Sequence, residues 1–92
     1  MRNITLRRYR ELYRKHGRHW YAVIVARRGY KQKQEAVFAV KDYGPVGANE
    51  ACFAKATEHC LITAGEPEVR VALVEVVLKP KTGMHVINRW SY

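Results

Sequence analysis

Residues 20–27 read Trp-Tyr-Ala-Val-Ile-Val-Ala-Arg, the clearest strand pattern in the sequence. Its aromatic and β-branched side chains predict a β-strand, followed by a turn at residues 28–30. Side chains alternate between the faces of a strand, so one face carries Trp20, Ala22, Ile24 and Ala26 and the other carries Tyr21, Val23 and Val25. A strand that is apolar on both faces is normally covered on both. We therefore expect Val23 and Val25 to be buried, by the chain itself or by a partner protein.

The residues that follow predict a second strand and then the main helix. Residues 31–40 form the partner strand, whose core face carries Ala36, Phe38 and Val40. Gly44-Pro45 opens the helix, because proline is tolerated in a first helical turn, and Gly65 ends it. The apolar stripe of this helix consists of Val46, Phe53, Ala56, Cys60 and Ala64.

The two ends of the chain complete the expected sheet. Residues 69–79 and 84–90 predict two strands joined by a turn at residues 80–83. Residues 4–16 fit two descriptions. The alternation of Ile4 and Leu6 favours a short strand, which we predict, whereas helical spacing is also present at Leu6, Tyr9, Leu12, Tyr13 and His16. The sequence thus predicts one α+β domain over residues 1–92, with a four- or five-stranded antiparallel sheet packed on one main helix in the order β-β-β-α-β-β.

Neither the cysteines nor the histidines predict a disulfide, a metal site or catalysis. Cys52 and Cys60 are eight residues apart on the predicted helix, about 12 Å along its axis, and a disulfide needs Cα atoms within roughly 7 Å. We expect both to be small buried residues, as suits a reducing cytoplasm. The histidines have no metal-ligand spacing, and no glycine-rich phosphate loop occurs. We therefore predict a non-enzymatic protein without a cofactor, a metal or a membrane segment, and without a signal peptide.

Positive charge is concentrated in the N-terminal third. The formal net charge is +9, and residues 1–34 hold eleven Lys and Arg against one acid, whereas residues 35–92 hold six basic and seven acidic residues. A solvated surface usually mixes charges of both signs, so this segregation predicts an anion-binding surface. The residues that we expect to contact nucleic acid are Arg7, Arg8, Arg10, Arg14, Lys15, Arg18, Arg27, Arg28, Lys31 and Lys33.

Aromatic and amide side chains lie among these cations. Tyrosines interleaved with arginines, as in Arg8-Tyr9-Arg10 and Tyr13-Arg14, combine phosphate contacts with surfaces for base stacking. On a strand, Lys31-Gln32-Lys33-Gln34 would place its lysines on one face and its glutamines on the other, where glutamines can bind adenine edges. The alternative is an edge strand that lysine keeps soluble.

The central segment resembles the DNA-binding domain named after the plant protein Apetala-two, to which the arm-binding domains of phage integrases are similar. The resemblance covers residues 13–60, and its closest match is Phe-Ala-Val-Lys-Asp-Tyr-Gly at residues 38–44. In that family three antiparallel strands pack on one helix, and the opposite sheet face enters the major groove. The resemblance implies that Trp20, Ala22 and Ile24 pack on the helix. It further implies that DNA meets His19, Tyr21, Val23, Val25, Gln32 and Gln34, of which His19, Tyr21, Gln32 and Gln34 are the expected base or partner contacts. The predicted C-terminal hairpin has no counterpart in the family.

A second resemblance concerns architecture alone. A compact chain of this length with two strands on either side of a helix is similar to phage anti-CRISPR proteins. This similarity implies an alternative function, in which a phage-encoded inhibitor binds an RNA-guided nucleoprotein complex and blocks its DNA path. The contacts of the inhibitor with the complex would be Tyr21, Val23 and Val25 or basic residues. The leading hypothesis remains direct nucleic-acid binding by a phage or mobile-element protein in the bacterial cytoplasm. The sequence leaves open the choice of DNA, RNA or a nucleoprotein, and the oligomeric state.

Overall fold

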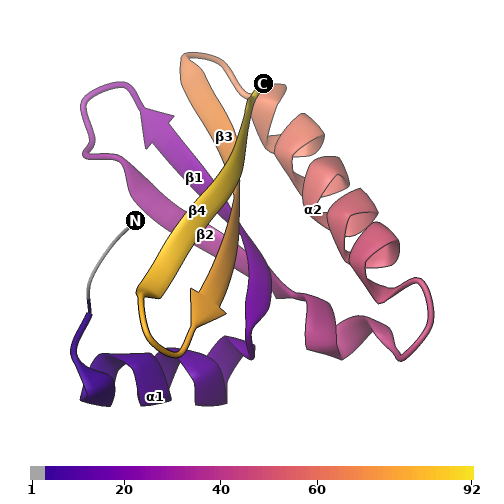
Figure 1. Cartoon of the computed structure of the whole chain (residues 1–92). Coiled ribbons are helices and arrows are strands. Elements are labelled where there is room, and N and C mark those ends of the chain that lie inside the picture. The colour runs from indigo at the N-terminus through magenta and orange to yellow at the C-terminus, as the bar shows by residue number, and fades with distance from the viewer. Residues whose placement is uncertain (1–3) are drawn as a thin grey trace.

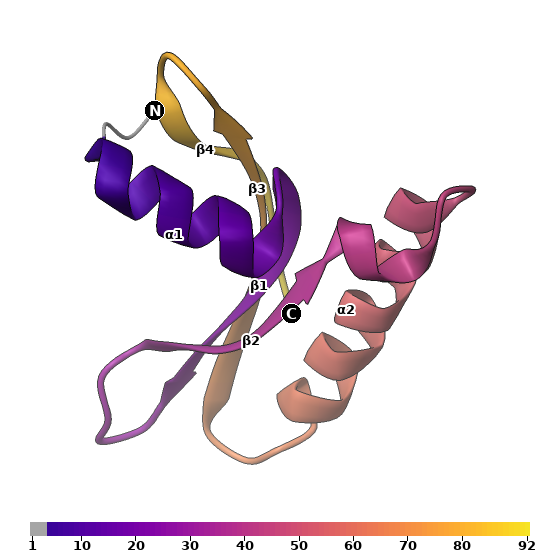
Figure 2. The same cartoon turned by 90° about the horizontal axis from the view of Figure 1, so that it is seen from below.

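The computed structural model describes residues 4–92, which form one antiparallel sheet with one α-helix on each of its faces (Figures 1 and 2). The elements in chain order are α1 (Leu6–His16), β1 (His19–Arg27), β2 (Lys33–Ala39), the 3₁₀ turn η1 (Val40–Tyr43), α2 (Ala48–Ala64), β3 (Val69–Lys79) and β4 (Gly83–Ser91). The strands lie in the order β2-β1-β3-β4. The predicted α+β class and four-stranded antiparallel sheet are confirmed. In the described chain, neither helix has the length and apolar character needed to cross a membrane.

β1 is a central strand that is covered on both faces, as its composition predicts. We call the face that carries Tyr21, Val23 and Leu73 the α2 face, because these side chains form one core with Cys52, Ala56 and Cys60 of α2. The opposite α1 face carries Trp20, Ala22, Val74 and Val76, which form a second core with Leu12 of α1. Val23 and Val25 are 0% and 1% exposed. The prediction that they are buried is confirmed, and the covering element is α2 of the same chain.

The assignment of faces that follows from the Apetala-two resemblance is wrong. Trp20, Ala22 and Ile24 pack on the α1 face and not on the main helix α2. The physical reason lies in the neighbouring strands. Val23 is paired with Leu73 on β3, and Tyr21 is paired with Phe38 on β2. Cross-strand partners point to the same face, so Tyr21 and Val23 join Phe38 and Leu73 in the core beneath α2.

The N-terminal segment is a helix, and the predicted strand is wrong. Thr5 caps α1, since its hydroxyl accepts a hydrogen bond from the Arg8 backbone N–H at 3.1 Å. Leu12 is buried in the core of the α1 face, with Tyr9 packed beside it, whereas Leu6 remains exposed. The alternation of two residues is therefore outweighed by a helix that buries its apolar side on the sheet. The order of elements becomes α-β-β-α-β-β.

The loop before α2 also differs from the prediction. Gly44 and Pro45 lie between η1 and α2, and the helix begins at Ala48 after Gly47, whose φ of +67° is left-handed. Val46 is consequently exposed and does not belong to the apolar stripe. The residues of α2 that are buried are Cys52, Ala56, Cys60 and Thr63. Both cysteines are free and buried, as predicted, and burial raises the pKa of each thiol to about 11.

The C-terminal hairpin joins the sheet and helps to close the α2 face. Trp90 on β4 lies 4.9 Å from the Phe53 ring of α2, and the Tyr21 ring lies 5.4 Å from that of Phe53. These three aromatic rings extend the core toward the β4 edge of the sheet. Phe53 therefore packs on Tyr21 and Trp90, on the α2 face.

Candidate nucleic-acid interface

The outer side of α1 is a basic surface. The helix carries five cations and one acid, Glu11. Because Leu12 faces the sheet, residues on the opposite side of the helix face solvent, and at 3.6 residues per turn Arg7, Arg10 and Arg14 share that side. Glu11 forms exposed ion pairs with Arg7 at 3.6 Å and Arg8 at 3.4 Å. Exposed pairs of this kind contribute little, so these arginines remain available to a stronger anionic partner.

A groove of about 840 Å³ lies between α1 and the start of η1. Cations and tyrosines dominate its wall, which consists of Tyr9, Arg10, Tyr13, Arg14, Gly17, Arg18, His19, Val40 and Lys41. The Tyr9 and Tyr13 rings stack 6.3 Å apart with an angle of 18° between their planes. We call this feature the α1 groove. It brings together three predicted cations, Arg10, Arg14 and Arg18, and adds Lys41, which the charge count by segment did not single out.

The position of Lys41 is fixed by the end of α1. Its ammonium group donates a hydrogen bond to the Arg14 carbonyl oxygen at 3.2 Å. Its alkyl chain passes over Gly17, where a Cβ would lie 3.1 Å from the Lys41 Cδ. Gly17 also has a φ of +77°, which a side chain would disfavour. Glycine at this position therefore ends the helix and leaves room for the lysine beside the groove.

The charged groups near His16 indicate a positive electrostatic potential at this end of α1. Its pKa is lowered by burial, and then by the nearby charges of Lys15, Lys41 and Arg8, whereas Asp42 opposes them with a smaller effect. Three cations thus outweigh the one nearby carboxylate. An anion that binds here would gain from the same potential.

The remaining predicted cations lie at the other end of β1, near the β1–β2 turn (Figure 1). Arg27 is paired with Glu35 and with Glu66, each at 3.1 Å, and Arg28 with Glu68 at 2.6 Å. The structure therefore divides the basic segment into two groups, and acids from distant parts of the chain compensate two members of the second group.

Only part of the predicted Lys-Gln alternation lies on a strand. Lys31 and Gln32 belong to the turn, because β2 begins at Lys33. Lys33 pairs with Val25 on the α2 face and Gln34 pairs with Ile24 on the α1 face. Lysine and glutamine therefore lie on opposite faces of the sheet, as predicted, only at Lys33 and Gln34.

Two arginines of the C-terminal hairpin extend the basic surface onto the sheet. Arg70 is the partner of Ala26 and Arg89 is the partner of Val74, so both lie on the α1 face. They line a hollow of about 550 Å³, whose other residues include Ile24, Ala26, Gln32, Ala72, Ser91 and Tyr92. Sequence reasoning missed both arginines because it summed charge by segment. The signal that points to them is their position in register with apolar residues of the α1 face.

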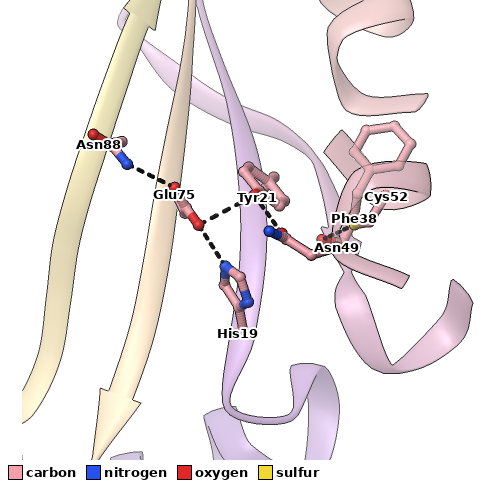
Figure 3. Close-up of polar contacts among 7 residues, drawn as sticks. All are labelled: His19, Tyr21, Phe38, Asn49, Cys52, Glu75 and Asn88. Atoms are coloured by element: carbon pink, nitrogen blue, oxygen red, sulfur yellow. Dashed lines mark hydrogen bonds and ion pairs between the residues drawn. The ribbon is translucent and has the colours of Figure 1, made fainter. Parts of the chain in front are cut away.

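His19 and Tyr21 belong to a polar network that is buried at Tyr21 and Glu75 and reaches the surface at its other members (Figure 3). Glu75 Oε2 accepts a hydrogen bond from the Tyr21 hydroxyl at 3.1 Å and also lies 2.7 Å from His19 Nε2. Its Oε1 accepts a hydrogen bond from the Asn88 amide at 2.9 Å. The Tyr21 hydroxyl also lies 2.6 Å from the Asn49 side-chain oxygen. Tyr21 is thus in the core, and it is not the outward base contact that the resemblance implies. The network joins β1, β3, β4 and α2.

Glu75 is expected to make folding stability depend on pH. Burial raises the pKa of this carboxyl, but the hydrogen bonds from Asn88, His19 and Tyr21 outweigh burial and lower it below the ordinary 4.5. A carboxyl with a lowered folded-state pKa stabilises the protein above its unfolded pKa, and this contribution is lost as the pH falls through the folded value. The free energy of unfolding, measured by chemical denaturation between neutral pH and a pH below 4.5, should fall more steeply for wild type than for Glu75→Gln. Identical pH profiles would contradict this role.

The chemistry available on the α1 face is anion binding and aromatic stacking. Within residues 4–92, no group of three or more His, Cys, Asp or Glu side chains could hold a metal ion. No protein-family model, curated protein or solved structure matches the chain.

Proposed function

We propose that this protein binds nucleic acid, without catalysis, through the α1 face and the outer side of α1. The observation that carries the proposal is the separation of charge between the two sides of the sheet. On one side lie the five cations of α1 and the two arginines of the sheet hollow, Arg70 and Arg89. The helix on the other side, α2, carries Glu50 and Glu58 against a single lysine, Lys55. Lys33 and Arg27 also lie on that side, and Arg27 is paired with Glu35 and Glu66.

The spread of the cations favours a polyanion over a small anion. β3 runs from beneath α1, where Val76 packs, to Arg70, and six residues of strand span about 20 Å. A single phosphate or carboxylate occupies only one point of such a surface, whereas a nucleic-acid backbone presents charges along its whole length. The tyrosines of the α1 groove add stacking surfaces that simple polyanions do not use.

The salt dependence of binding tests this proposal. Wild-type affinity for nucleic acid should fall linearly on a double-logarithmic plot against salt, with a slope of about −0.9 per phosphate contact for duplex DNA. The triple variant Arg7→Ala/Arg10→Ala/Arg14→Ala should flatten the slope by up to about 2.7 if each arginine contacts one phosphate. Alanine is the best helix former, so the variant should fold, which circular dichroism can verify.

Lys55→Ala on α2 is the control for the triple variant, and its slope should equal that of wild type. If wild type binds neither single-stranded nor duplex nucleic acid at low salt, the proposal fails. If it then binds an RNA-guided nucleoprotein complex, the inhibitor hypothesis replaces the proposal. Contacts in that case would come from basic residues, because Tyr21, Val23 and Val25 are buried under α2.

A further inference from the structure

Resting on the proposed function, we infer that the α1 groove holds an unpaired base of single-stranded nucleic acid, stacked on Tyr13. Tyr13 is 47% exposed, although it lies on the wall of the groove beside the partly buried Tyr9. The two rings are nearly parallel, at 18°. A planar base that enters the groove can therefore add to an aromatic arrangement that already exists.

The shape and lining of the groove favour a base. Its volume of about 840 Å³ falls in the range of small-molecule sites. Its lining combines two tyrosine rings and Val40 with the cations Arg10, Arg14, Arg18 and Lys41. A base in a duplex is already stacked on both of its neighbours, so its flat face cannot reach Tyr13. Only an unpaired base has a free face for a protein ring.

The cations of the groove lie where the flanking phosphates would pass. Arg10 and Arg14 lie on α1, whereas Arg18 and Lys41 lie on the segments that follow α1 and β2. These cations belong to both segments that border the groove, and Lys41 is held in place by the Arg14 carbonyl. Charge complementarity with a phosphodiester chain therefore accompanies the stacking surface.

Tyr30 offers a matched control in the same chain. It is 79% exposed and lies near Lys31 and Lys33 in the β1–β2 turn. The difference lies in the acids of its surroundings, since Glu35 lines the same hollow and is paired with Arg27. An exposed tyrosine near lysines is thus present at both sites, but only the α1 groove lacks a carboxylate on the described wall.

The test measures binding of Tyr13→Leu, Tyr13→Phe and Tyr30→Leu to an oligothymidine of about 12 nucleotides and to a duplex of equal length. Tyr13→Leu should weaken single-strand binding about 5- to 150-fold, the range for one lost base stack, and should change duplex binding less than about 2-fold. Tyr13→Phe, which keeps the ring, and Tyr30→Leu should both bind the single strand like wild type.

Three results would overturn the inference: no loss in Tyr13→Leu, an equal loss for single strand and duplex, or a loss in Tyr13→Phe as large as in Tyr13→Leu. These results differ from failure of the proposed function, in which wild type itself binds neither ligand. Circular dichroism of Tyr13→Leu establishes that the effect is local. Unfolding is not expected, because Tyr13 is half exposed and leucine is a good helix former.

Discussion

The double variant Val23→Lys/Val25→Lys is expected to unfold the protein. Both valines are inaccessible to solvent and pack with Cys52, Ala56 and Leu73 beneath α2. Burial of each valine contributes about 1.5–3 kcal/mol, and two ammonium groups without partners would add a further cost of desolvation. A domain of this kind holds about 5–15 kcal/mol in total, so the variant should lose its cooperative transition.

Thermal unfolding followed by circular dichroism measures this outcome. The matched control is Val86→Lys/Ile87→Lys on the edge strand β4, where the two side chains are 55% and 48% exposed. Surface substitutions of this kind usually change stability by no more than about 0.5 kcal/mol each. The control should therefore melt close to wild type. If the Val23 and Val25 variant also melts cooperatively near wild type, α2 does not cover that face in solution.

The strands of the core could be predicted because their signal is local. β3 has the predicted bounds, and β1 and the hairpin turn agree with the expectation to within a residue or two. The N-terminal helix could not be predicted from local sequence. The alternation of Ile4 and Leu6 favours a strand, whereas the spacing of Leu6, Tyr9 and Leu12 favours a helix. The choice depends on burial of Leu12 in one core with Trp20, which only the assembled sheet provides.

Which helix covers which face of β1 could not be predicted from that strand, since both of its faces are apolar. The assignment depends on partners in other strands, such as Phe38 and Leu73 on the α2 face. Gly44-Pro45 fits a helix start as well as the loop that it forms, because proline suits both contexts. These differences arise from tertiary contacts, which local sequence does not encode.

The same limit applies to the candidate site. The cations of α1 could be predicted, since they are dense and adjacent in the sequence. The pairing of Arg27 and Arg28 with Glu66 and Glu68 joins residues about 40 positions apart. Arg89 reaches the α1 face through the register of β3 and β4, which shifts between Glu75 and Val76. A count of charge along the chain contains none of this information.

Reversing one charge in the sheet hollow is expected to weaken nucleic-acid binding strongly. Both arginines lie on the α1 face, so in Arg70→Glu and in Arg89→Glu the proposed phosphate contact would be replaced by repulsion. Hydrogen bonds to charged groups contribute about 1.5–3 kcal/mol, so each variant should bind roughly 10- to 150-fold more weakly. Both arginines are exposed, so folding should be unaffected.

Lys55→Glu on α2 separates the effect of position from the effect of net charge. All three variants change the formal charge by the same amount, and Lys55 is an exposed lysine with one i,i+3 partner, Glu58, at 3.8 Å. If binding depends only on the total charge of +9, Lys55→Glu should weaken it as much as Arg70→Glu does. If nucleic acid lies on the α1 face, the loss for Lys55→Glu should be several-fold smaller at moderate salt, because charges beyond a Debye length of about 10 Å are largely screened. Equal losses in the three variants would remove the assignment to one face while leaving nucleic-acid binding itself in place.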